Sequence, residues 1–312
     1  MNKIAFLVNG TLQNKSQIIH NAKKEFGEYE VTILESLHQS HLTALAHQAL
    51  NEGNRILVVA GGDGSTNEVV NGIAEYAKEI NTDQYNWQKI DNIRLGILPC
   101  GTGNDFTKTI QIDNDIARLH TLINLDQYQK CDIGFARFFD KDKKEATRYF
   151  LNITDVGMGG IVVEKLERKL PFLSRSFSYN LSIASTFLTY DKARVRADSK
   201  DFNYEGRVMN CIIANGKYFG NGLGIAPDAS VYDGKFNIVI LGNINFIDYL
   251  KNLGEVKKCK RIVHEEVKYY TTDELSIVSP DNTAMPIDMD GEFIGYAPLI
   301  CKNISKVLNI YM

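Results

Sequence analysis

The first 127 residues alternate short aliphatic runs with longer segments in which apolar positions follow a helical period. Aliphatic runs that end at glycine or polar residues are typical of buried strands. The runs lie at residues 4–8, 29–34, 56–60 and 93–98. Helices are predicted between and after them, over residues 17–26, 40–52 and 66–80 and through Phe106. This alternation of strand and helix predicts a doubly wound α/β domain.

A different pattern begins at about residue 128, where short β-rich runs replace the helical period. Many short strands with turn residues between them predict a β-sandwich-like domain. The predicted strands lie at residues 130–139, 147–156, 193–197, 208–214, 235–241, 267–270, 275–278, 287–289 and 306–311. The chain is therefore expected to divide into an α/β domain, residues 1–127, and a β-sandwich domain, residues 128–299.

A helical insert over about residues 162–188 interrupts the predicted sandwich. Its centre, residues 170–177, mixes aromatic with basic side chains. One interpretation is a lip that touches a lipid surface. The other is a helix that packs its aromatic residues onto the sandwich, and the shortness of the motif favours this second interpretation.

Composition narrows the classes of function. The chain has 312 residues and a net charge of −3, which argues against a nucleic-acid-binding protein and against strong electrostatic attachment to an anionic membrane. No apolar stretch approaches the roughly 18 residues that a membrane span requires. The apolar residues 4–8 are too short for a signal peptide. Five scattered cysteines without metal-binding spacing predict reduced thiols in a cytoplasmic protein.

A glycine-rich turn, Gly-Gly-Asp-Gly-Ser-Thr-Asn-Glu at residues 61–68, follows the run at residues 56–60. Ser65 and Thr66 are candidate N-caps of the next helix, so the stretch predicts a strand, a tight turn and a helix. Glycines allow positive φ angles and a close backbone approach, and a helix N-terminus offers N–H groups to a phosphate. Asp63 beside a phosphate predicts an acid that holds Mg²⁺ or takes a proton. A plain tight turn is the alternative for this motif by itself.

A second glycine turn follows about 40 residues later, at residues 99–106. It repeats the order of aliphatic run, glycine turn and polar cluster. Two such turns suit neighbouring strands of one α/β sheet, because their loops meet at the same edge. The repetition favours a binding site over two unrelated turns.

Three stretches together resemble the diacylglycerol kinase catalytic-domain family, in its soluble bacterial lipid kinase branch. They are GGDGSTNEVVNG at residues 61–72, LPCGTGNDF at residues 98–106 and DMDGE at residues 288–292. The resemblance therefore spans nearly the whole chain. The first stretch alone is shared with NAD kinases and 6-phosphofructokinases, whereas the three together are specific.

The resemblance implies an ATP site built from the two glycine turns. The residues implied to contact the nucleotide or to shape its turns are Gly61, Gly62, Asp63, Gly64, Ser65, Thr66, Asn67, Glu68, Thr102 and Asn104. Thr102 would donate its hydroxyl to the nucleotide, and Asn104 would brace the loop. Asn9 matches a nucleotide-contacting asparagine, although Gly10 replaces the proline that follows it in relatives. Ser36 takes the place of a nucleotide-contacting threonine, with an ordinary loop residue as the alternative.

The resemblance also implies phosphoryl transfer, in which Mg²⁺ neutralises phosphate charge and a base accepts the hydroxyl proton. Asp63 and Asp105 would hold Mg²⁺. Asp290 and Glu292 would lie across a cleft between the domains, and residues from about 300 to 312 would return to the first domain. Glu292 is the first choice for the base, with Asp290 as a metal or base partner. Asp-Gly is also a strong hairpin signal, and a turn that presents an acid satisfies both interpretations.

A second Mg²⁺ site is implied by residues 230–235, which are similar to a structural metal site of some bacterial relatives. Asp233 would supply its carboxylate, and Ser230 and Lys235 would supply backbone carbonyls. Tyr232 stands where relatives often carry another acid, so a simple turn at Asp233 is an equal alternative.

The leading functional hypothesis is an ATP-dependent, Mg²⁺-requiring lipid kinase with a diacylglycerol-like acceptor. The alternatives are an NAD kinase and a homologue that binds lipid or nucleotide without turnover. A lipid acceptor would be met at the inner face of the membrane, through peripheral and transient contact. A homodimer is the default expectation for the assembly.

Overall fold

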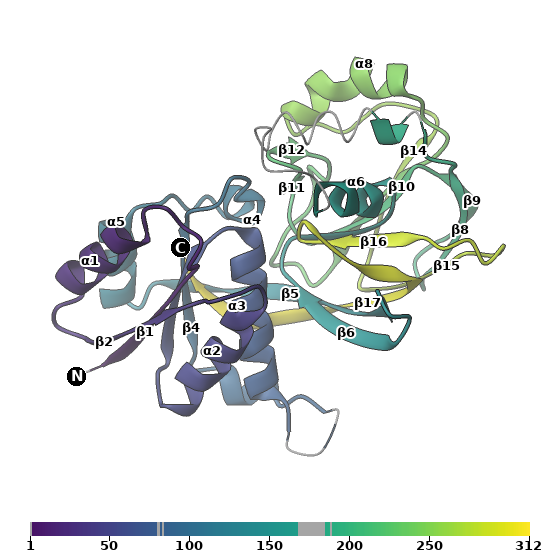
Figure 1. The fold of residues 1–312 in the computed structure, drawn as a ribbon. Coiled ribbons are helices and arrows are strands. Elements are labelled where there is room, and N and C mark those ends of the chain that lie inside the picture. The colour runs from purple at the N-terminus through teal and green to yellow at the C-terminus, as the bar shows by residue number, and fades with distance from the viewer. Residues whose placement is uncertain (1, 80–81, 83, 168–184, 188) are drawn as a thin grey trace. The chain divides into compact units, whose positions relative to one another are not determined.

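The computed structural model describes residues 2–79, 82, 84–167, 185–187 and 189–312 (Figure 1). It divides into two compact units, one of Met1–Ile133 with Ile304–Met312 and the other of Gly134–Asn303. The sequence pattern places the corresponding boundaries at residue 127 and about residue 300. The two ends of the chain therefore belong to the same unit.

The N-terminal unit is built on a parallel sheet in the order β2-β1-β3-β4, with the end of β17 beside β4. Its strands are β1 (Lys3–Val8), β2 (Glu30–Glu35), β3 (Ile56–Gly61), β4 (Arg94–Pro99) and the last part of β17 (Glu292–Tyr311). Its helices are α1 (Lys15–Glu25), α2 (His41–Asn51), α3 (Asp63–Ala77), η1 (Trp87–Ile90), α4 (Asp105–Thr109) and α5 (Ile116–Asn124). This arrangement confirms the predicted doubly wound α/β fold.

The aliphatic character of β1, β3 and β4 follows from burial on both faces. Helices α1 and α5 pack on one face of the sheet, and α2 and α3 lie on the other (Figure 1). Phe6, Val58 and Leu98 share a core with Phe26 at the end of α1. Strands covered by helices on both sides have no polar face, so they read as continuous apolar runs.

The C-terminal unit is a β-sandwich, as predicted. One set of strands runs in the order β14-β13-β10-β7-β16-β17, while β17 also pairs with β15 and β5, β15 pairs with β8 and β8 with β9. The strands are β5 (Tyr128–Asp140), β6 (Glu145–Phe150), β7 (Ile153–Gly157), β8 (Ala193–Asp198), β9 (Asn203–Val208), β10 (Asn210–Ala214), β11 (Tyr218–Phe219), β12 (Leu223–Gly224), β13 (Phe236–Leu241), β14 (Val267–Thr272), β15 (Glu274–Val278) and β16 (Pro286–Met289). The helices are α6 (Met158–Glu167) and α8 (Phe246–Lys257). Stacked rings of Phe150 and Phe236, 5.5 Å apart, lie in its core.

Several sequence-based predictions for this unit are wrong in detail. Residues 147–156 form two strands, β6 and β7, because the backbone between them turns to bind the carboxylate of Asp290. The final strand begins at Glu292 and not at residue 306. Helix α6 begins at Met158, before the predicted insert, and residues 170–177 lie outside the described residues.

The helices α5 and α8 and the strand β9 are missing from the sequence-based prediction. The pattern of α8 is blurred because apolar residues lie on both sides of it: Val256 is buried, whereas Ile247 and Leu250 are exposed. A capping box formed by Asn245 and Asp248 marks its start and is the sequence signal that could have found it.

The structure also bears on the expectations about the cysteines and about membrane-spanning segments. All five cysteine thiols are free, and those of Cys131, Cys211 and Cys301 are buried. In the part of the chain that the structure describes, no helix is both long and apolar enough to cross a membrane.

Two mid-helix glycines provide a matched test of helix packing. A Cβ on Gly72 of α3 would lie 2.4 Å from the carbonyl oxygen of Thr43 in α2, whereas a Cβ on Gly254 of α8 would meet nothing within 4 Å. We expect Gly72→Ala to lower the free energy of unfolding by about 1–3 kcal/mol, because α2 and α3 must move apart. Gly254→Ala should raise it by about 0.4–1 kcal/mol.

Urea unfolding followed by circular dichroism measures both effects. The fluorescence of Trp87, the single tryptophan, reports the N-terminal unit alone and should shift only for Gly72→Ala. A Gly72→Ala protein as stable as the wild type would contradict the close approach of the two helices.

Candidate functional site

The first glycine turn joins β3 to α3, and the helix begins at Asp63 with Gly62 as its N-cap. The prediction of Ser65 or Thr66 as N-cap is wrong, because both residues lie inside the first helical turn. The Thr66 hydroxyl donates instead to the carbonyl oxygen of Gly62 at 3.2 Å. Since the first N–H groups of a helix have no carbonyl partner within it, the turn has the geometry of a helix N-terminal anion site.

Close backbone approach, and not positive φ, explains the glycines of this turn. Gly61, Gly62 and Gly64 are absent from the residues with positive φ, so that part of the expectation is wrong. A Cβ on Gly61 would lie 2.4 Å from the Cβ of Ser65. A Cβ on Gly62 would lie 3.1 Å from the Cα of Gly101 in the second turn. The two glycine turns therefore touch backbone to backbone.

The carboxylate of Asp63 joins the two turns. Its Oδ2 accepts the backbone N–H of Asp105 at 3.0 Å, and its Oδ1 accepts that of Phe106 at 3.1 Å. These N–H groups open helix α4, so Asp63 caps a helix that lies 42 residues away in sequence. Burial raises the pKa of Asp63, and the two N–H donors oppose this rise.

The carboxylates of Asp63 and Asp105 both approach Gly103 closely. A Cβ on Gly103 would lie 3.2 Å from Asp63 Oδ2 and 3.4 Å from Asp105 Oδ2. The ammonium group of Lys108 holds the other oxygen of Asp105 at 3.0 Å. Carboxylate oxygens are preferred ligands of Mg²⁺, which takes further ligands from water and phosphate, so the two side chains fit the predicted metal. No group of three or more histidine, cysteine or acidic side chains is placed to hold a metal ion among the described residues.

Three polar side chains gather at the carboxyl ends of β1, β2 and β3. Asn9 Nδ2 donates to Ser65 Oγ at 2.9 Å, and Ser36 Oγ accepts the N–H of Gly10 at 3.1 Å. They meet because β1 pairs in parallel with both β2 and β3. Asn9 and Ser36 therefore lie at the sheet edge where the first glycine turn begins.

Asn67 and Glu68 hold neighbouring structure. The Glu68 carboxylate accepts the N–H groups of Ser40 at 2.8 Å and Leu42 at 2.9 Å, at the start of α2. Asn67 is fully buried, and its side-chain oxygen accepts a hydrogen bond from Asn71 at 3.1 Å. These contacts hold the start of α2 and the inside of α3, and the two roles predicted for the pair, fixing the turn or reaching the nucleotide, stay predictions.

Asn104 braces the second glycine turn. Its side chain accepts the N–H of Gly101 and donates to the carbonyl oxygen of the same residue, both at 2.9 Å. Its φ of 51° lies in the left-handed region, which asparagine tolerates well. Thr102, inside the braced loop, is exposed, so its hydroxyl can reach a bound molecule.

In the C-terminal unit, Asp290 and Gly291 form the two-residue turn between β16 and β17. Their φ angles of 48° and 84° are those of a type I′ hairpin, for which Asp-Gly is a preferred pair. The Asp290 carboxylate accepts the N–H groups of Leu151, Asn152 and Ile153 at distances of 3.0, 3.1 and 3.0 Å. The hairpin is therefore a turn that also fixes an acid.

Glu292, the first residue of β17, forms an ion pair with Arg148 of β6. The distance from Glu292 Oε2 to Arg148 Nη1 is 2.8 Å, and the two side chains are 20% and 22% exposed. This pair orients the glutamate and leaves it within reach of solvent. The expectation that Asp290 and Glu292 lie across a cleft from the glycine turns stays a prediction.

Two further acids lie beside this hairpin, and the sequence analysis gave them no role. Asp155 of β7 and Asp288 of β16 are partners in register on neighbouring antiparallel strands. Both carboxylate oxygens of Asp155 and Oδ1 of Asp288 are buried without a hydrogen-bond partner among the described residues. Burial raises the pKa of Asp155 to about 7. Burial and then Asp155 raise the pKa of Asp288 well above its ordinary value. The sequence signal that could have identified Asp155 is an acid within the predicted strand at residues 147–156.

The implied second metal site forms a turn. The Asp233 carboxylate accepts the N–H of Lys235 at 3.1 Å, and Ser230 Oγ accepts that of Tyr232 at 3.3 Å. Asp233 itself is exposed. The segment at residues 230–235 forms the turn that was the alternative to a metal site, and binding of Mg²⁺ by this segment stays a prediction.

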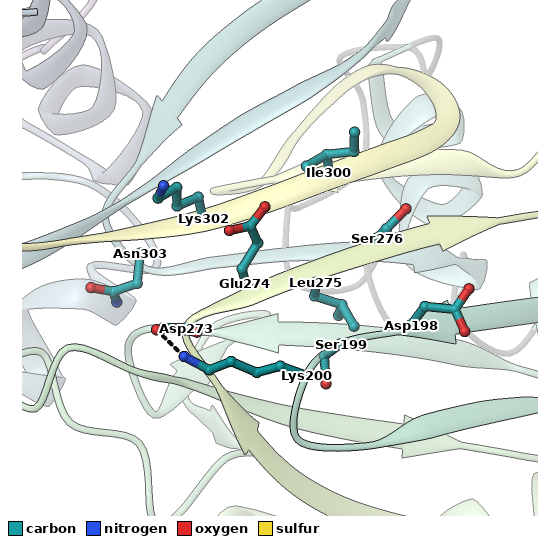
Figure 2. Close-up of a pocket in the computed structure, with 10 residues that line it drawn as sticks. All are labelled: Asp198, Ser199, Lys200, Asp273, Glu274, Leu275, Ser276, Ile300, Lys302 and Asn303. Carbon is teal, nitrogen blue, oxygen red and sulfur yellow. Dashed lines mark hydrogen bonds and ion pairs between the residues drawn. The ribbon is translucent and has the colours of Figure 1, made fainter.

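A pocket of about 390 Å³ lies among β8, β15 and β17, and no predicted site residue lines it (Figure 2). Its lining residues are Asp198, Ser199, Lys200, Asp273, Glu274, Leu275, Ser276, Ile300, Lys302 and Asn303. Lys200 pairs with Asp273 at 2.7 Å, and Lys302 lies opposite Glu274 in the strand register. Because basic and acidic groups face each other, the pocket lacks the single-signed charge that a phosphate site requires.

Comparison with known proteins covers nearly all of the chain. Residues 3–136 match the diacylglycerol kinase catalytic domain, and residues 154–312 match the YegS C-terminal NAD kinase beta sandwich-like domain. A diacylglycerol kinase of Staphylococcus carnosus (strain TM300) is 26% identical over 289 residues, which cover 93% of this chain and 87% of that protein. A diacylglycerol kinase of Staphylococcus haemolyticus (strain JCSC1435) is 27% identical over 288 residues, with coverages of 92% and 80%.

Solved structures show the same fold. A candidate diacylglycerol kinase of Bacillus anthracis str. Sterne superimposes with a TM-score of 0.73 at 18% identity, covering 99% of this chain and 97% of that one. A second structure of a diacylglycerol kinase from this organism gives 0.66 at 18% identity, with coverages of 99% and 96%. The two-unit architecture is therefore shared over the full length.

Asp63→Asn tests whether this carboxylate holds the two turns together. An asparagine offers one acceptor oxygen to the N–H groups of Asp105 and Phe106, so we expect the free energy of unfolding to fall by about 1–2 kcal/mol. Thr102→Val removes an exposed hydroxyl from the same loop and should leave stability unchanged. Thermal unfolding followed by Trp87 fluorescence measures both variants, and equal stability of Asp63→Asn and wild type would exclude the capping role.

The buried carboxyl groups predict a stability that falls as pH rises. Unfolded, Asp155 loses its proton near its ordinary pKa of 3.8, whereas in the folded protein its pKa is about 7. Between these values the unfolded state releases the proton first, so the contribution of Asp155 to wild-type stability should decline from pH 4 to pH 7. Asp155→Asn removes this titration, and its stability relative to wild type should increase over the same range, by at most about 4 kcal/mol.

Urea unfolding at pH 5 and pH 8 measures the difference. Asp201→Asn, an exposed position in the same unit, is the control and should show no such trend. An Asp155→Asn protein whose stability relative to wild type is the same at both pH values would contradict the raised pKa.

Proposed function

This chain belongs to the diacylglycerol kinase catalytic-domain family, and we propose that it transfers the γ-phosphate of ATP to the hydroxyl group of a lipid. Its staphylococcal relatives are named diacylglycerol kinases, so a diacylglycerol-like molecule is the proposed acceptor. At 26–27% identity this likeness supports the class of reaction more strongly than the choice of acceptor.

The observation that carries this proposal is the contact of two glycine turns at one edge of the parallel sheet. Phosphoryl transfer depends on positioning and on stabilising charge more than on covalent chemistry by the protein. The N-terminus of α3 offers N–H groups to phosphate oxygens, and Gly62 and Gly101 bring the second turn against it. Asn9 and Thr102 would then add side-chain contacts to the nucleotide.

Asp63 and Asp105 are the residues that would hold Mg²⁺. When bound, the ion would neutralise charge on the β- and γ-phosphates. The fit rests on the approach of both carboxylates to Gly103, where a side chain would crowd them. Asp63 also fixes the second turn, so the same carboxylate would set the shape of the site and contribute to its charge.

Glu292 is proposed to accept the proton of the lipid hydroxyl. Arg148 holds its Oε2 at 2.8 Å, and the glutamate side chain is 20% exposed, so it can be reached by a hydroxyl group from solvent. Asp290 receives three N–H donors, so its carboxylate is committed to fixing the hairpin. We therefore give Asp290 the role of positioning Glu292 and assign the proton transfer to Glu292.

The remaining expectations follow from a lipid acceptor. A kinase of this type must meet a membrane to reach its substrate, and we propose peripheral and transient contact at the inner face. The second Mg²⁺ at Asp233 and a homodimer stay predictions.

The test is transfer of labelled γ-phosphate from ATP, with Mg²⁺, to lipids in mixed detergent micelles. The panel holds diacylglycerol, monoacylglycerol, sphingosine, phosphatidylglycerol and undecaprenol, with NAD in a parallel reaction. We expect label in diacylglycerol. Label in NAD alone would replace the lipid kinase by an NAD kinase. Bound ATP without label in any acceptor would favour a protein that binds without turnover.

Glu292→Gln is the matched variant for this assay. We expect kcat to fall by about 10²–10⁴, because the proton acceptor is lost. The variant also removes the charge that faces Arg148, which should lower the free energy of unfolding by no more than about 1 kcal/mol. Asp290→Asn should lower stability as well, since three N–H groups lose their anionic acceptor. Turnover near wild type in Glu292→Gln would remove Glu292 from the mechanism.

A further inference from the structure

The outer side of α8 and the loop that follows it expose an unusual set of apolar side chains. Ile247, Leu250 and Val263 are 62%, 51% and 93% exposed. Large hydrophobic residues elsewhere in the described chain are mostly buried in the two cores, and the other exposed ones, Leu37, Leu125 and Phe139, are scattered. Single exposed residues need no explanation, whereas a group of them marks an interaction surface.

The exposed positions of α8 fall on one face of the helix. Ile247, Leu250, Lys251, Gly254 and Lys258 follow the spacing i, i+3, i+4, i+7 and i+11, and all are exposed. Residues at this spacing lie one above another along a helix. The exposed face therefore has two apolar side chains at its start and lysines along the rest.

The opposite face of α8 holds the helix on its unit. The rings of Phe246 and Tyr249 pack against Phe187, with centroids 5.7 and 5.0 Å away, and Val256 is buried. Asn245 and Asp248 close the capping box at its N-terminus. The helix lies at the outer edge of the C-terminal unit (Figure 1). The exposed apolar side chains are thus additional to those that fold the helix.

Positive charge accompanies these apolar side chains. Residues 247–263 contain five basic residues and two acidic ones, in a chain whose net charge is −3. The exposed basic residues are Lys251, Lys257, Lys258, Lys260 and Arg261. Lys258 lies 3.7 Å from Glu255 and Arg261 pairs with Asp228, while the other three form no ion pair within residues 189–312. Lys260 and Val263 belong to the loop that returns to the start of α8, where His264 Nε2 lies 3.9 Å from Asp248 Oδ2. The exposed residues Ile247, Leu250, Lys251, Lys257, Lys260 and Val263 are called here the α8 surface, which is both apolar and basic.

We propose that the α8 surface docks on anionic membrane, with Ile247, Leu250 and Val263 entering the headgroup region and the lysines facing lipid phosphates. Lysine stems lie along apolar surface while their ammonium groups stay in a polar layer, which suits this arrangement. Attraction to an anionic surface also accounts for basic residues concentrated here on an acidic chain. The proposal deepens the proposed function, because it names the surface by which a lipid kinase would reach its acceptor.

Binding to vesicles tests the surface without any catalytic step. Co-sedimentation is measured with vesicles of phosphatidylglycerol and phosphatidylcholine and with vesicles of phosphatidylcholine alone. We expect binding to the anionic vesicles that weakens as salt is raised, and little binding to neutral ones. No binding of the wild type to anionic vesicles would overturn the proposal, and so would equal binding to both kinds.

Paired variants locate the surface. Ile247→Ser with Leu250→Ser, and separately Lys251→Glu with Lys257→Glu, should each weaken partitioning to anionic vesicles about tenfold or more. The matched controls are Leu37→Ser with Leu125→Ser, and Lys23→Glu with Lys24→Glu on α1, which remove exposed residues of the same types elsewhere. Equal losses in the controls would overturn the assignment to α8. Thermal unfolding shows that each variant is folded.

Kinase assays separate this proposal from the proposed function. The α8 variants should phosphorylate acceptor in detergent micelles at wild-type rates and acceptor in anionic vesicles about tenfold more slowly. Loss of activity in both presentations would contradict a docking role. If the wild type binds vesicles through α8 but phosphorylates no lipid, the proposed function fails and the membrane surface stands. Oligomers that dissociate in the Ile247→Ser variant, without vesicle binding, would identify a second copy as the occupant instead.

Discussion

The hydrogen bonds of the Asp63 carboxylate hold together the part of the protein on which the proposed chemistry depends. They bind the first N–H groups of α4 to the start of α3, so one side chain fixes two glycine turns. The two turns begin at the same height along the sheet, because Gly61 and Pro99 are partners in the parallel register of β3 and β4. Glycines at 62 and 101 are required because their backbones touch. Burial of the acid is unfavourable by itself, and the N–H donors offset part of that cost.

The C-terminal unit uses the same device. Asp290 binds three successive N–H groups of residues 151–153 and thereby ends one strand and begins another. In both units an acid beside a glycine accepts N–H groups from a segment that is distant in sequence. Charge-assisted hydrogen bonds of this kind position a loop more firmly than neutral ones. They also leave other carboxylates, Asp105 and Glu292, in defined places where chemistry can use them.

Two features of the C-terminal unit, the Asp155–Asp288 pair and the α8 surface, are not explained by the stability of the fold. Asp155 and Asp288 lie side by side on neighbouring strands with unpartnered buried oxygens, which no requirement of the sandwich fold explains. The α8 surface exposes apolar side chains that the fold does not bury. Departures from good packing and from polar satisfaction tend to gather at functional places. Both lie in the C-terminal unit, the part of the chain in which the sequence pattern was least informative.

The sequence by itself determined the alternation of strands and helices in the N-terminal unit, the β-rich character of the rest and the presence of two glycine turns after neighbouring strands. These features are local, because periodicity and turn signals depend on residues that are close together in the sequence. The sequence could not determine that Asp63 caps α4 or that Glu68 caps α2, since the partners lie tens of residues away. The pairing of Asp155 with Asp288 and the outward face of α8 were likewise decided only by tertiary structure. Burial and long-range hydrogen bonds, and not residue type, assign a carboxylate to a cap, a core or a reactive site.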